Sequence, residues 1–94
     1  MARVITDYGY VAYIADVIVL PEYQGKGIGG EIMRRVMAYI KDRTAPGQCM
    51  YIALMAAEGK EGFYERFGFK KRPAGNLGCG MTLWYEKERE GVYE

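Results

Sequence analysis

The 94-residue sequence predicts one small domain of the mixed α/β class. Three observations lead to this prediction. An apolar run of strand formers is followed by a glycine-rich stretch and then by a helical period, and a second apolar run comes after that. The order strand, helix, strand is that of a βαβ unit, in which the two strands are parallel and the crossover is right-handed.

The first half of the chain gives the first strands. Residues 2–6 alternate weakly and lead into Asp7-Tyr8-Gly9, which is typical of a hairpin turn. The run "YVAYIADVIVL", residues 10–20, is apolar on both faces apart from Asp16. We therefore expect a central strand covered on both sides. Pro21 ends it, because proline has no N–H to give to a strand ladder.

The middle of the chain predicts the crossover helix and the second strand. Between residues 28 and 43 the apolar positions recur at helical spacing, at Ile28, Ile32, Met33, Val36, Met37 and Ile40. This stripe predicts the core face of an amphipathic helix. "TAPGQ" breaks the helix, and "CMYIALMAA", residues 49–57, reads as a strand.

The last third predicts a short helix and two further strands. Phe63 and Phe67 lie four residues apart, as on one helix face, and Gly68 follows as a helix-ending glycine. We expect strands at residues 69–72 and 81–86, joined by the loop "AGNLGCG". The charged residues 87–94 are expected to be a frayed tail.

Composition excludes several classes of protein. The net charge is +1, which is not the basic field of a nucleic-acid binder, and no run of about 20 apolar residues exists to span a membrane. The chain has no histidine, and its two cysteines, Cys49 and Cys79, have no metal-binding spacing. We therefore expect free thiols, no metal site and a cytoplasmic protein without nucleic-acid or membrane partners.

The stretch "PEYQGKGIGG", residues 21–30, lies between a strand and a helix. Backbone amides at a helix N-terminus favour an anion, and glycines let it approach closely, so the pattern indicates a pyrophosphate site. A P-loop is excluded because no Lys-Ser or Lys-Thr follows. A dinucleotide fingerprint G-x-G-x-x-G matches at Gly25, Gly27 and Gly30. However, the acidic residue that binds the ribose should end the second strand about 20 residues further on, and that region is still the predicted helix.

"DVIVLPEYQGKGIGGEIM" resembles motif A of the GNAT N-acetyltransferases, whose core Q/R-x-x-G-x-G/A is met by Gln24, Gly27 and Gly29. "FYERFGF", residues 63–69, resembles the second signature of that family. The resemblance covers residues 10–86. It implies a GNAT-like fold with splayed parallel strands and antiparallel flanking strands.

The resemblance also implies an acetyl-CoA-dependent enzyme that transfers acetyl directly to a primary amine. The cofactor-binding residues would then be Val17, Ile18, Val19, Gln24, Gly25, Lys26, Gly27, Ile28, Gly29 and Gly30. Tyr64 matches the family tyrosine that protonates the leaving thiolate. No acid lies in residues 49–57, so Asp16 is the candidate general base.

The chain departs from the family pattern at its N-terminus. A strand, two helices and another strand usually precede the portion seen here, and without them residues 3–6 would form an exposed edge strand. The chain is then either a natural short form that dimerises, a fragment of a longer protein, or a form that keeps the cofactor site without catalysis. We expect a homodimer that covers this edge. An alternative is a non-catalytic CoA-binding or assembly module, and a Rossmann-like nucleotide-binding module is a more distant possibility. The sequence does not select the amine acceptor.

Overall fold

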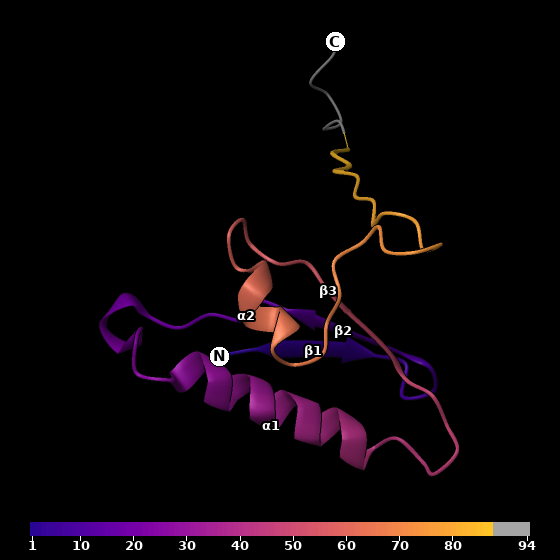
Figure 1. Ribbon diagram of the computed structural model, residues 1–94, viewed down its shortest axis with the longest axis horizontal. Helices are drawn as coiled ribbons and strands as arrows, with labels where there is room; N and C mark the ends of the chain where they lie inside the picture. The colour runs from indigo at the N-terminus through magenta and orange to yellow at the C-terminus, as the bar shows by residue number, and fades with distance from the viewer. Residues whose placement is uncertain (88–94) are drawn as a thin grey trace.

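The computed structural model describes residues 1–87 and contains a three-stranded mixed sheet (Figure 1). The strands are β1 (Arg3–Thr6), β2 (Val11–Ala15) and β3 (Tyr51–Leu54), in that order across the sheet. β1 is antiparallel to β2, and β3 is parallel to β2. The predicted α/β class and the parallel βαβ unit are thus confirmed.

The turn between β1 and β2 is held by one carboxylate. Asp7 Oδ1 accepts hydrogen bonds from the amides of Gly9, Tyr10 and Val11 at 2.9, 2.9 and 3.1 Å. These bonds favour the charged carboxylate and therefore lower the pKa of Asp7 from 3.8 to about 2. The bond from Tyr10 has the largest effect. The predicted hairpin turn at Asp7-Tyr8-Gly9 is confirmed, with Tyr8 in the left-handed region at φ 59°.

The central strand is shorter than predicted, and within residues 1–87 only one of its faces is fully buried. β2 ends at Ala15, because Asp16 takes a left-handed conformation with φ 55°, which interrupts the extended run predicted for residues 10–20. Ala12 and Ile14 are buried, whereas Val11 on the other face is 38% exposed. The prediction of a strand covered on both sides is therefore wrong for this chain.

Helix α1 (Ile28–Asp42) supplies the other half of the core. Its apolar stripe lies on the sheet as predicted, with Met33 and Ile40 buried against Ala12 and Ile14. The half-buried side chains around these four include Val36 and Met37 of the same stripe. This packing fixes the N-terminus of α1 at the end where β2 finishes.

Strand β3 covers only Tyr51–Leu54 of the predicted residues 49–57. It leads into helix α2 (Glu61–Glu65), a single short turn beside α1 (Figure 1). The rings of Phe63 and Phe67 lie 5.5 Å apart edge to face, and both pack against the core, as their spacing predicts. Gly68 closes the turn at φ 96°, with its amide donating to the carbonyl of Glu65 at 3.1 Å.

The two predicted C-terminal strands are not present. Residues 69–72 and 81–86 are in no sheet, and the only pairing there within the described residues is an antiparallel bridge between Ala74 and Leu77. Alternation alone suggested these strands, but a strand also requires a hydrogen-bonded neighbour, and residues 81–87 lead away from β3 (Figure 1). Of the predicted tail, residues 88–94 lie outside the described part of the chain.

Cys49 and Cys79 are exposed free thiols, as expected. Within residues 1–87, no helix combines the length and the apolar character needed to cross a membrane.

Candidate active site

The glycine loop presents an open surface at the start of α1. A short 3₁₀ turn, η1 (Pro21–Tyr23), leads into it. Gly25 and Gly27 both have φ 78°, in the left-handed region that L side chains rarely adopt, and Gly27 is the N-cap of α1. A Cβ built on either glycine would meet no atom within 4 Å, so nothing from the described chain fills the space above the loop.

The amides of this loop are free to bind an anion. Within residues 1–87, no hydrogen bond uses the N–H groups of residues 25–30, whereas Glu31 N–H already donates to the Gly27 carbonyl at 3.1 Å. Unpaired amides and the positive end of the helix dipole favour a phosphate at this position. The loop therefore has the open glycines and unpaired donors that a pyrophosphate group requires.

Two polar side chains of the loop take local positions. Gln24 Nε2 donates to the Val19 carbonyl at 2.9 Å, which ties the loop back to the segment after β2. Lys26 Nζ lies 5.8 Å from the centre of the Tyr23 ring, at the outer limit of a cation–π contact. The Gln24 side chain thus stabilises the conformation of the loop, while the Lys26 ammonium group lies near the Tyr23 ring.

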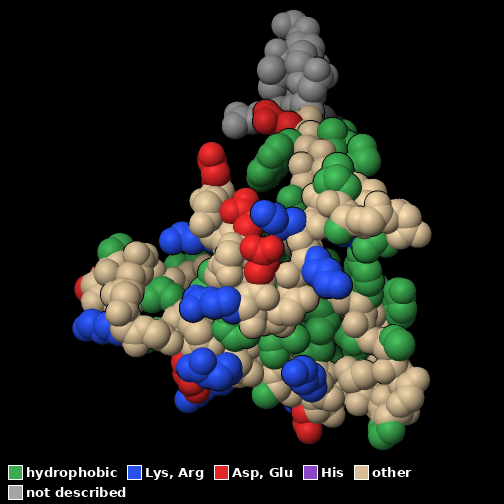
Figure 2. Space-filling model, viewed as in Figure 1, with side chains coloured by type: hydrophobic (Ala, Val, Ile, Leu, Met, Phe, Trp, Pro, Cys, Tyr) green, Lys and Arg blue, Asp and Glu red, His purple; other side chains and the backbone are tan. Residues whose placement is uncertain are grey.

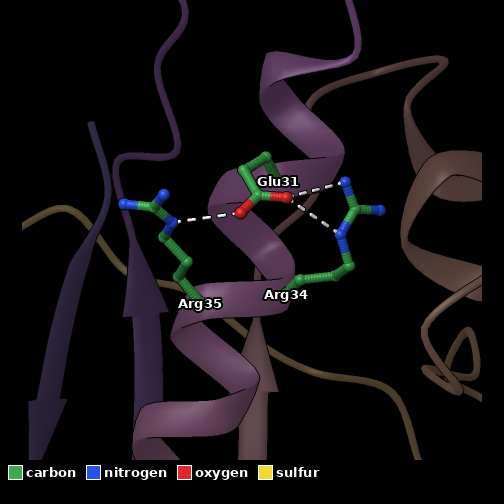
Figure 3. Close-up of polar contacts among 3 residues, drawn as sticks. All are labelled: Glu31, Arg34 and Arg35. Carbon is green, nitrogen blue, oxygen red and sulfur yellow. Dashed lines mark hydrogen bonds and ion pairs between the residues drawn. The ribbon is translucent and has the colours of Figure 1, made fainter.

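The first turns of α1 carry an excess of positive charge (Figure 3). Glu31 Oε2 accepts hydrogen bonds from Arg34 Nη2 and Nε at 2.9 and 3.1 Å, and its Oε1 accepts one from Arg35 Nε at 3.1 Å. These hydrogen bonds lower the pKa of the Glu31 carboxyl, and the bonds from Arg34 have a larger effect than the bond from Arg35. Two guanidinium groups with one carboxylate leave a net positive charge near the loop.

Arg34 reaches the loop itself. A Cβ built on Gly30 would lie 3.5 Å from Arg34 Nη1, so the guanidinium lies directly beside the first turn of α1. Both arginine side chains are largely exposed, at 63% for Arg34 and 81% for Arg35. The four-residue spacing of Gly30 and Arg34 puts Arg34 on the same helix face as Gly30.

The segment after β2 is displaced in register by one residue. In the β1–β2 ladder Arg3 lies opposite Ala15, but beyond Asp16 it is Ile18 that pairs with Met1. Asp16 is thus the extra residue of a β-bulge. Because successive residues of an extended chain direct their polar groups to opposite sides, those of Val17 and Val19 point away from β1.

The predicted cofactor-binding residues 17–19 therefore divide into two sets. Ile18 uses both of its backbone groups on Met1, at 2.7 Å each. Val17 and Val19 direct theirs to the side of β3, where the β2–β3 ladder has ended at the Ile14–Leu54 pair. Val17 and Val19 are therefore the two whose backbone faces that gap, and the Val19 carbonyl already accepts a hydrogen bond from Gln24 Nε2.

The start of α1 lies close to α2 and to the segment after β2. A Cβ on Gly29 would lie 3.5 Å from the Phe63 ring and 3.9 Å from Val19 Cγ2. The lack of a side chain at Gly29 lets the start of α1 approach both. Three predicted parts of the site, the segment after β2, the glycine loop and α2, meet at this point.

Tyr64 lies beside that contact. Its ring is 5.0 Å from Phe63 and 6.4 Å from Phe69, edge to face in both cases. Burial raises the pKa of its hydroxyl above the ordinary value of 10.0, so the hydroxyl keeps its proton at neutral pH. Tyr64 lines an open hollow of about 290 Å³ whose floor is Leu54, Met55 and Ala56 at the end of β3.

Asp16 lies elsewhere. Its Oδ2 is 2.6 Å from Arg3 Nη2 of β1, in an ion pair with both side chains about half exposed. Asp16 does not line the hollow of Tyr64, whereas two other carboxylates do, Glu61 and Glu65 of α2. Sequence reasoning missed both. Their positions three residues before Tyr64 and one after it on a helical segment were the available signal.

Among the described residues, no three Cys, Asp or Glu side chains are grouped so that they could hold a metal ion.

Comparison with known proteins identifies the family. Residues 1–71 match the model of an acetyltransferase (GNAT) domain. The chain is 34% identical over 87 residues to GCN5-related N-acetyltransferase 2, chloroplastic, of Arabidopsis thaliana, covering 93% of this chain and 31% of the relative. It is 31% identical over 86 residues to the uncharacterized N-acetyltransferase ycf52 of Porphyra purpurea, covering 92% and 45%.

Solved structures agree. A probable acetyltransferase of methicillin-resistant Staphylococcus aureus superposes with a TM-score of 0.75 at 37% identity, covering 89% of this chain and 60% of that one. A GNAT family protein of Streptococcus pneumoniae gives a TM-score of 0.70 at 27% identity, covering 93% and 61%.

The chain belongs to the GNAT acetyltransferase family, as the two sequence signatures indicated. Its relatives are named N-acetyltransferases, and the family is one of acyl-transferring enzymes. The chain spans between about a third and just under half of the length of these two curated relatives, 31% and 45%.

Proposed function

We propose that this protein is a cytoplasmic enzyme that moves an acetyl group from acetyl-CoA directly to a primary amine. One observation supports the proposal: the start of α1 at the open glycine loop lies close, at Gly29 and Phe63, to the short helix that holds Tyr64. The proposed anion site and the proposed acid are therefore on neighbouring elements. Bound acetyl-CoA would supply the activated acetyl group.

The chain offers groups for two parts of acetyl-CoA, the pyrophosphate and the pantetheine arm. The free amides of residues 25–30 and the Arg34 guanidinium would bind the pyrophosphate. The backbone of Val17 and Val19 would pair with the pantetheine arm, and Gln24 would keep the Val19 carbonyl in place. Ile18 would support this segment through its two hydrogen bonds to Met1.

Tyr64 would act as the acid. As the amine nitrogen bonds to the acetyl carbon and the carbon–sulfur bond breaks, the sulfur leaves as a thiolate and takes the proton of the Tyr64 hydroxyl. The raised pKa keeps that proton available at neutral pH. The amine loses its own proton to a carboxylate, for which Asp16 remains our candidate, with Glu61 and Glu65 nearer to Tyr64.

The proposal includes the assembly of the protein. The open edge of β1 and the uncovered face of the sheet, with Ile5 57% and Tyr51 47% exposed, favour a homodimer. Light scattering at micromolar concentration should give twice the chain mass, and a clean monomer would reject the dimer. We propose no nucleic-acid or membrane partner, because the charge is nearly balanced.

Thermal unfolding with and without acetyl-CoA tests the site, with NAD and ATP as controls. A ligand at about 100 times its Kd stabilises the fold by about 2.7 kcal/mol. Stabilisation by acetyl-CoA alone supports the cofactor site, and NAD stabilisation would favour the Rossmann-like alternative. Release of free thiol with a panel of amines then separates the enzyme from a non-catalytic CoA-binding module.

A further inference from the structure

The hollow of Tyr64 is lined by charged groups of both signs. Glu61 and Glu65 line it from α2, and residues 70–72, with the sequence Lys-Lys-Arg, line it from the segment that follows. Within residues 1–87 no ion pair joins the two sets. Figure 2 shows acidic and basic side chains close together on the surface over α2. The hollow therefore presents both kinds of charge to a ligand beside Tyr64.

Packing holds the basic residues at this hollow. Gly68 turns the chain after α2, in the left-handed region at φ 96°. The ring that follows, Phe69, packs against the core and lies 6.4 Å from the Tyr64 ring, edge to face. Because the Phe69 ring is anchored there, residues 70–72 pass the hollow as the next part of the chain.

The three cations differ in what else they do. Arg72 Nη1 donates to the Tyr51 hydroxyl at 2.6 Å, and Arg72 Nε donates to the Gly78 carbonyl at 2.7 Å. Lys70 also lines a second open hollow, of about 410 Å³, beside β3. Lys71 lines the hollow of Tyr64 alone, and within residues 1–87 its ammonium group forms no ion pair. Lys71 is therefore the cation with the fewest competing contacts.

The floor of the hollow is apolar. Leu54, Met55 and Ala56 line it at the end of β3, and Met55 is 59% exposed. A short methylene chain can cover part of this surface and gain from leaving water. The volume of about 290 Å³ suits a small molecule. The hollow thus combines carboxylates, cations and an apolar floor in a space of modest size.

We propose that the acceptor of this protein is a small zwitterion, a primary amine that carries a carboxylate or phosphate group on a short chain. This inference rests on the proposed function. The amine lies toward Glu61 and Glu65 beside Tyr64, and the anion lies toward Lys71. A simple alkylamine leaves the cations without a partner. A diamine brings a second positive charge into a hollow where cations outnumber carboxylates three to two, and like charges repel.

Binding of a matched series of probes tests the acceptor class without requiring turnover. The isotope-labelled full chain is titrated with γ-aminobutyrate, butylamine, diaminopropane and aminopropylphosphonate, with and without CoA, and the amide NMR shifts of residues 61–65 and 70–72 are followed. These probes share an aminopropyl group and differ in the group at its other end. We expect the carboxylate or the phosphonate probe to bind about three- to fivefold more tightly than butylamine. Whichever of the two binds more tightly identifies the anion. Equal or tighter binding of butylamine or diaminopropane, or no binding of any probe, would overturn the proposal.

Lys71→Gln tests the specificity role of this residue. We expect the substitution to weaken γ-aminobutyrate binding about three- to fivefold and to leave butylamine binding unchanged. Lys41→Gln is the matched control, because Lys41 is an exposed lysine in the last turn of α1 and does not line the hollow. The same change in both variants, or a Lys71→Gln variant that still prefers γ-aminobutyrate to the same degree, would show that Lys71 does not select the acceptor.

Release of free thiol from acetyl-CoA separates this inference from the proposed function. If the chain binds γ-aminobutyrate in preference to butylamine but releases no thiol with any probe, the proposed function fails and the hollow is a binding site for zwitterions. If the chain acetylates butylamine or diaminopropane with a kcat/KM equal to or above that for the zwitterions, the proposed function is supported and the acceptor class is wrong.

Discussion

Met1 and Ile18 exchange two backbone hydrogen bonds of 2.7 Å each, one residue out of step with the ladder between β1 and β2. The shift arises at Asp16, which stands in the left-handed region at φ 55° and forms an ion pair with Arg3. Asp16 therefore has a structural role at the bulge, which is separate from the catalytic role proposed for it.

Replacing Asp16 by Asn separates these two roles. Asn tolerates the left-handed conformation, and an exposed ion pair contributes at most about 1 kcal/mol, so the fold should persist. If Asp16 is the base, Asp16→Asn lowers kcat and removes the acidic limb of its pH profile. Arg3→Gln is the matched control, because it breaks the same ion pair and keeps the carboxylate. An unchanged pH profile in Asp16→Asn would remove Asp16 from the mechanism and direct attention to Glu61 and Glu65.

Tyr64→Phe should leave the fold intact and slow the reaction. The ring contacts with Phe63 and Phe69 do not involve the hydroxyl, whereas acid catalysis typically contributes about 10²- to 10⁴-fold. We expect kcat to fall within that range with little change in the KM for acetyl-CoA. Tyr51→Phe, on β3 outside the hollow of Tyr64, is the control. Full activity in Tyr64→Phe would contradict the acid role.

The raised pKa of Tyr64 also predicts how its contributions to stability and to catalysis depend on pH. Because the folded chain holds the proton more tightly than the unfolded chain, the stabilisation is complete below pH 10 and is lost as the pH rises through the folded pKa. The acid function should therefore persist across the neutral range and fail only under strongly alkaline conditions.

Arg34→Gln tests the basic group beside the glycine loop. Arg34 and Arg35 both bind Glu31, but only Arg34 lies next to Gly30. We expect Arg34→Gln to raise the Kd for CoA about 5- to 20-fold and to reduce its salt dependence, as loss of a phosphate contact does. Calorimetry on Arg35→Gln provides the comparison. Equal effects of the two substitutions would mean that Arg34 makes no specific contact.

Gly27→Ala should damage the loop, while Gly29→Ala should not destabilise it. Gly27 has φ 78°, where a Cβ costs about 1–2 kcal/mol, and its amide lies in the proposed phosphate site. At Gly29 the φ is ordinary, and a methyl group would meet Phe63 at 3.5 Å, a normal contact distance. Urea unfolding measures both. Equal destabilisation would show that the left-handed conformation is not what requires glycine at Gly27.

Asp7→Asn should remove an acid-sensitive part of the stability. The pKa of Asp7 is lowered to about 2, so its stabilising effect is present above the ordinary value of 3.8 and is lost as the pH falls through about 2. The Asn oxygen still accepts the three amide bonds but does not titrate there. Thermal unfolding between pH 5 and pH 2 should show a smaller loss in Asp7→Asn than in wild type. Parallel curves would mean that the carboxylate contributes nothing specific.

Sequence alone predicted the elements that local pattern determines. The stripe from Ile28 to Ile40 gave α1 nearly to the residue, and the carboxylate at Asp7 gave the hairpin turn. The four-residue spacing of Phe63 and Phe67 gave α2 its packing face. Each depends on residues close in the chain, where periodicity and turn chemistry act directly.

What sequence did not predict depends on distant partners. The bulge at Asp16 exists because Met1 pairs with Ile18, a relation between residues 17 positions apart. Within residues 1–87 no helix packs on the second face of β2, and a run of apolar residues does not reveal which of its faces will be packed. Residues 81–86 alternate like a strand, yet whether they pair is decided at the edge of β3. The position of the Arg34 guanidinium beside Gly30 depends on a side-chain conformation, which the sequence does not specify.

The proximity of Gly29 to Phe63 limits what the start of α1 tolerates. Phe63 precedes Tyr64 on α2, so the ring nearest to Gly29 and the ring that lines the hollow belong to adjacent residues. A methyl group at Gly29 would reach the Phe63 ring at an ordinary contact distance, whereas a larger side chain would displace that ring and, with it, the neighbouring Tyr64.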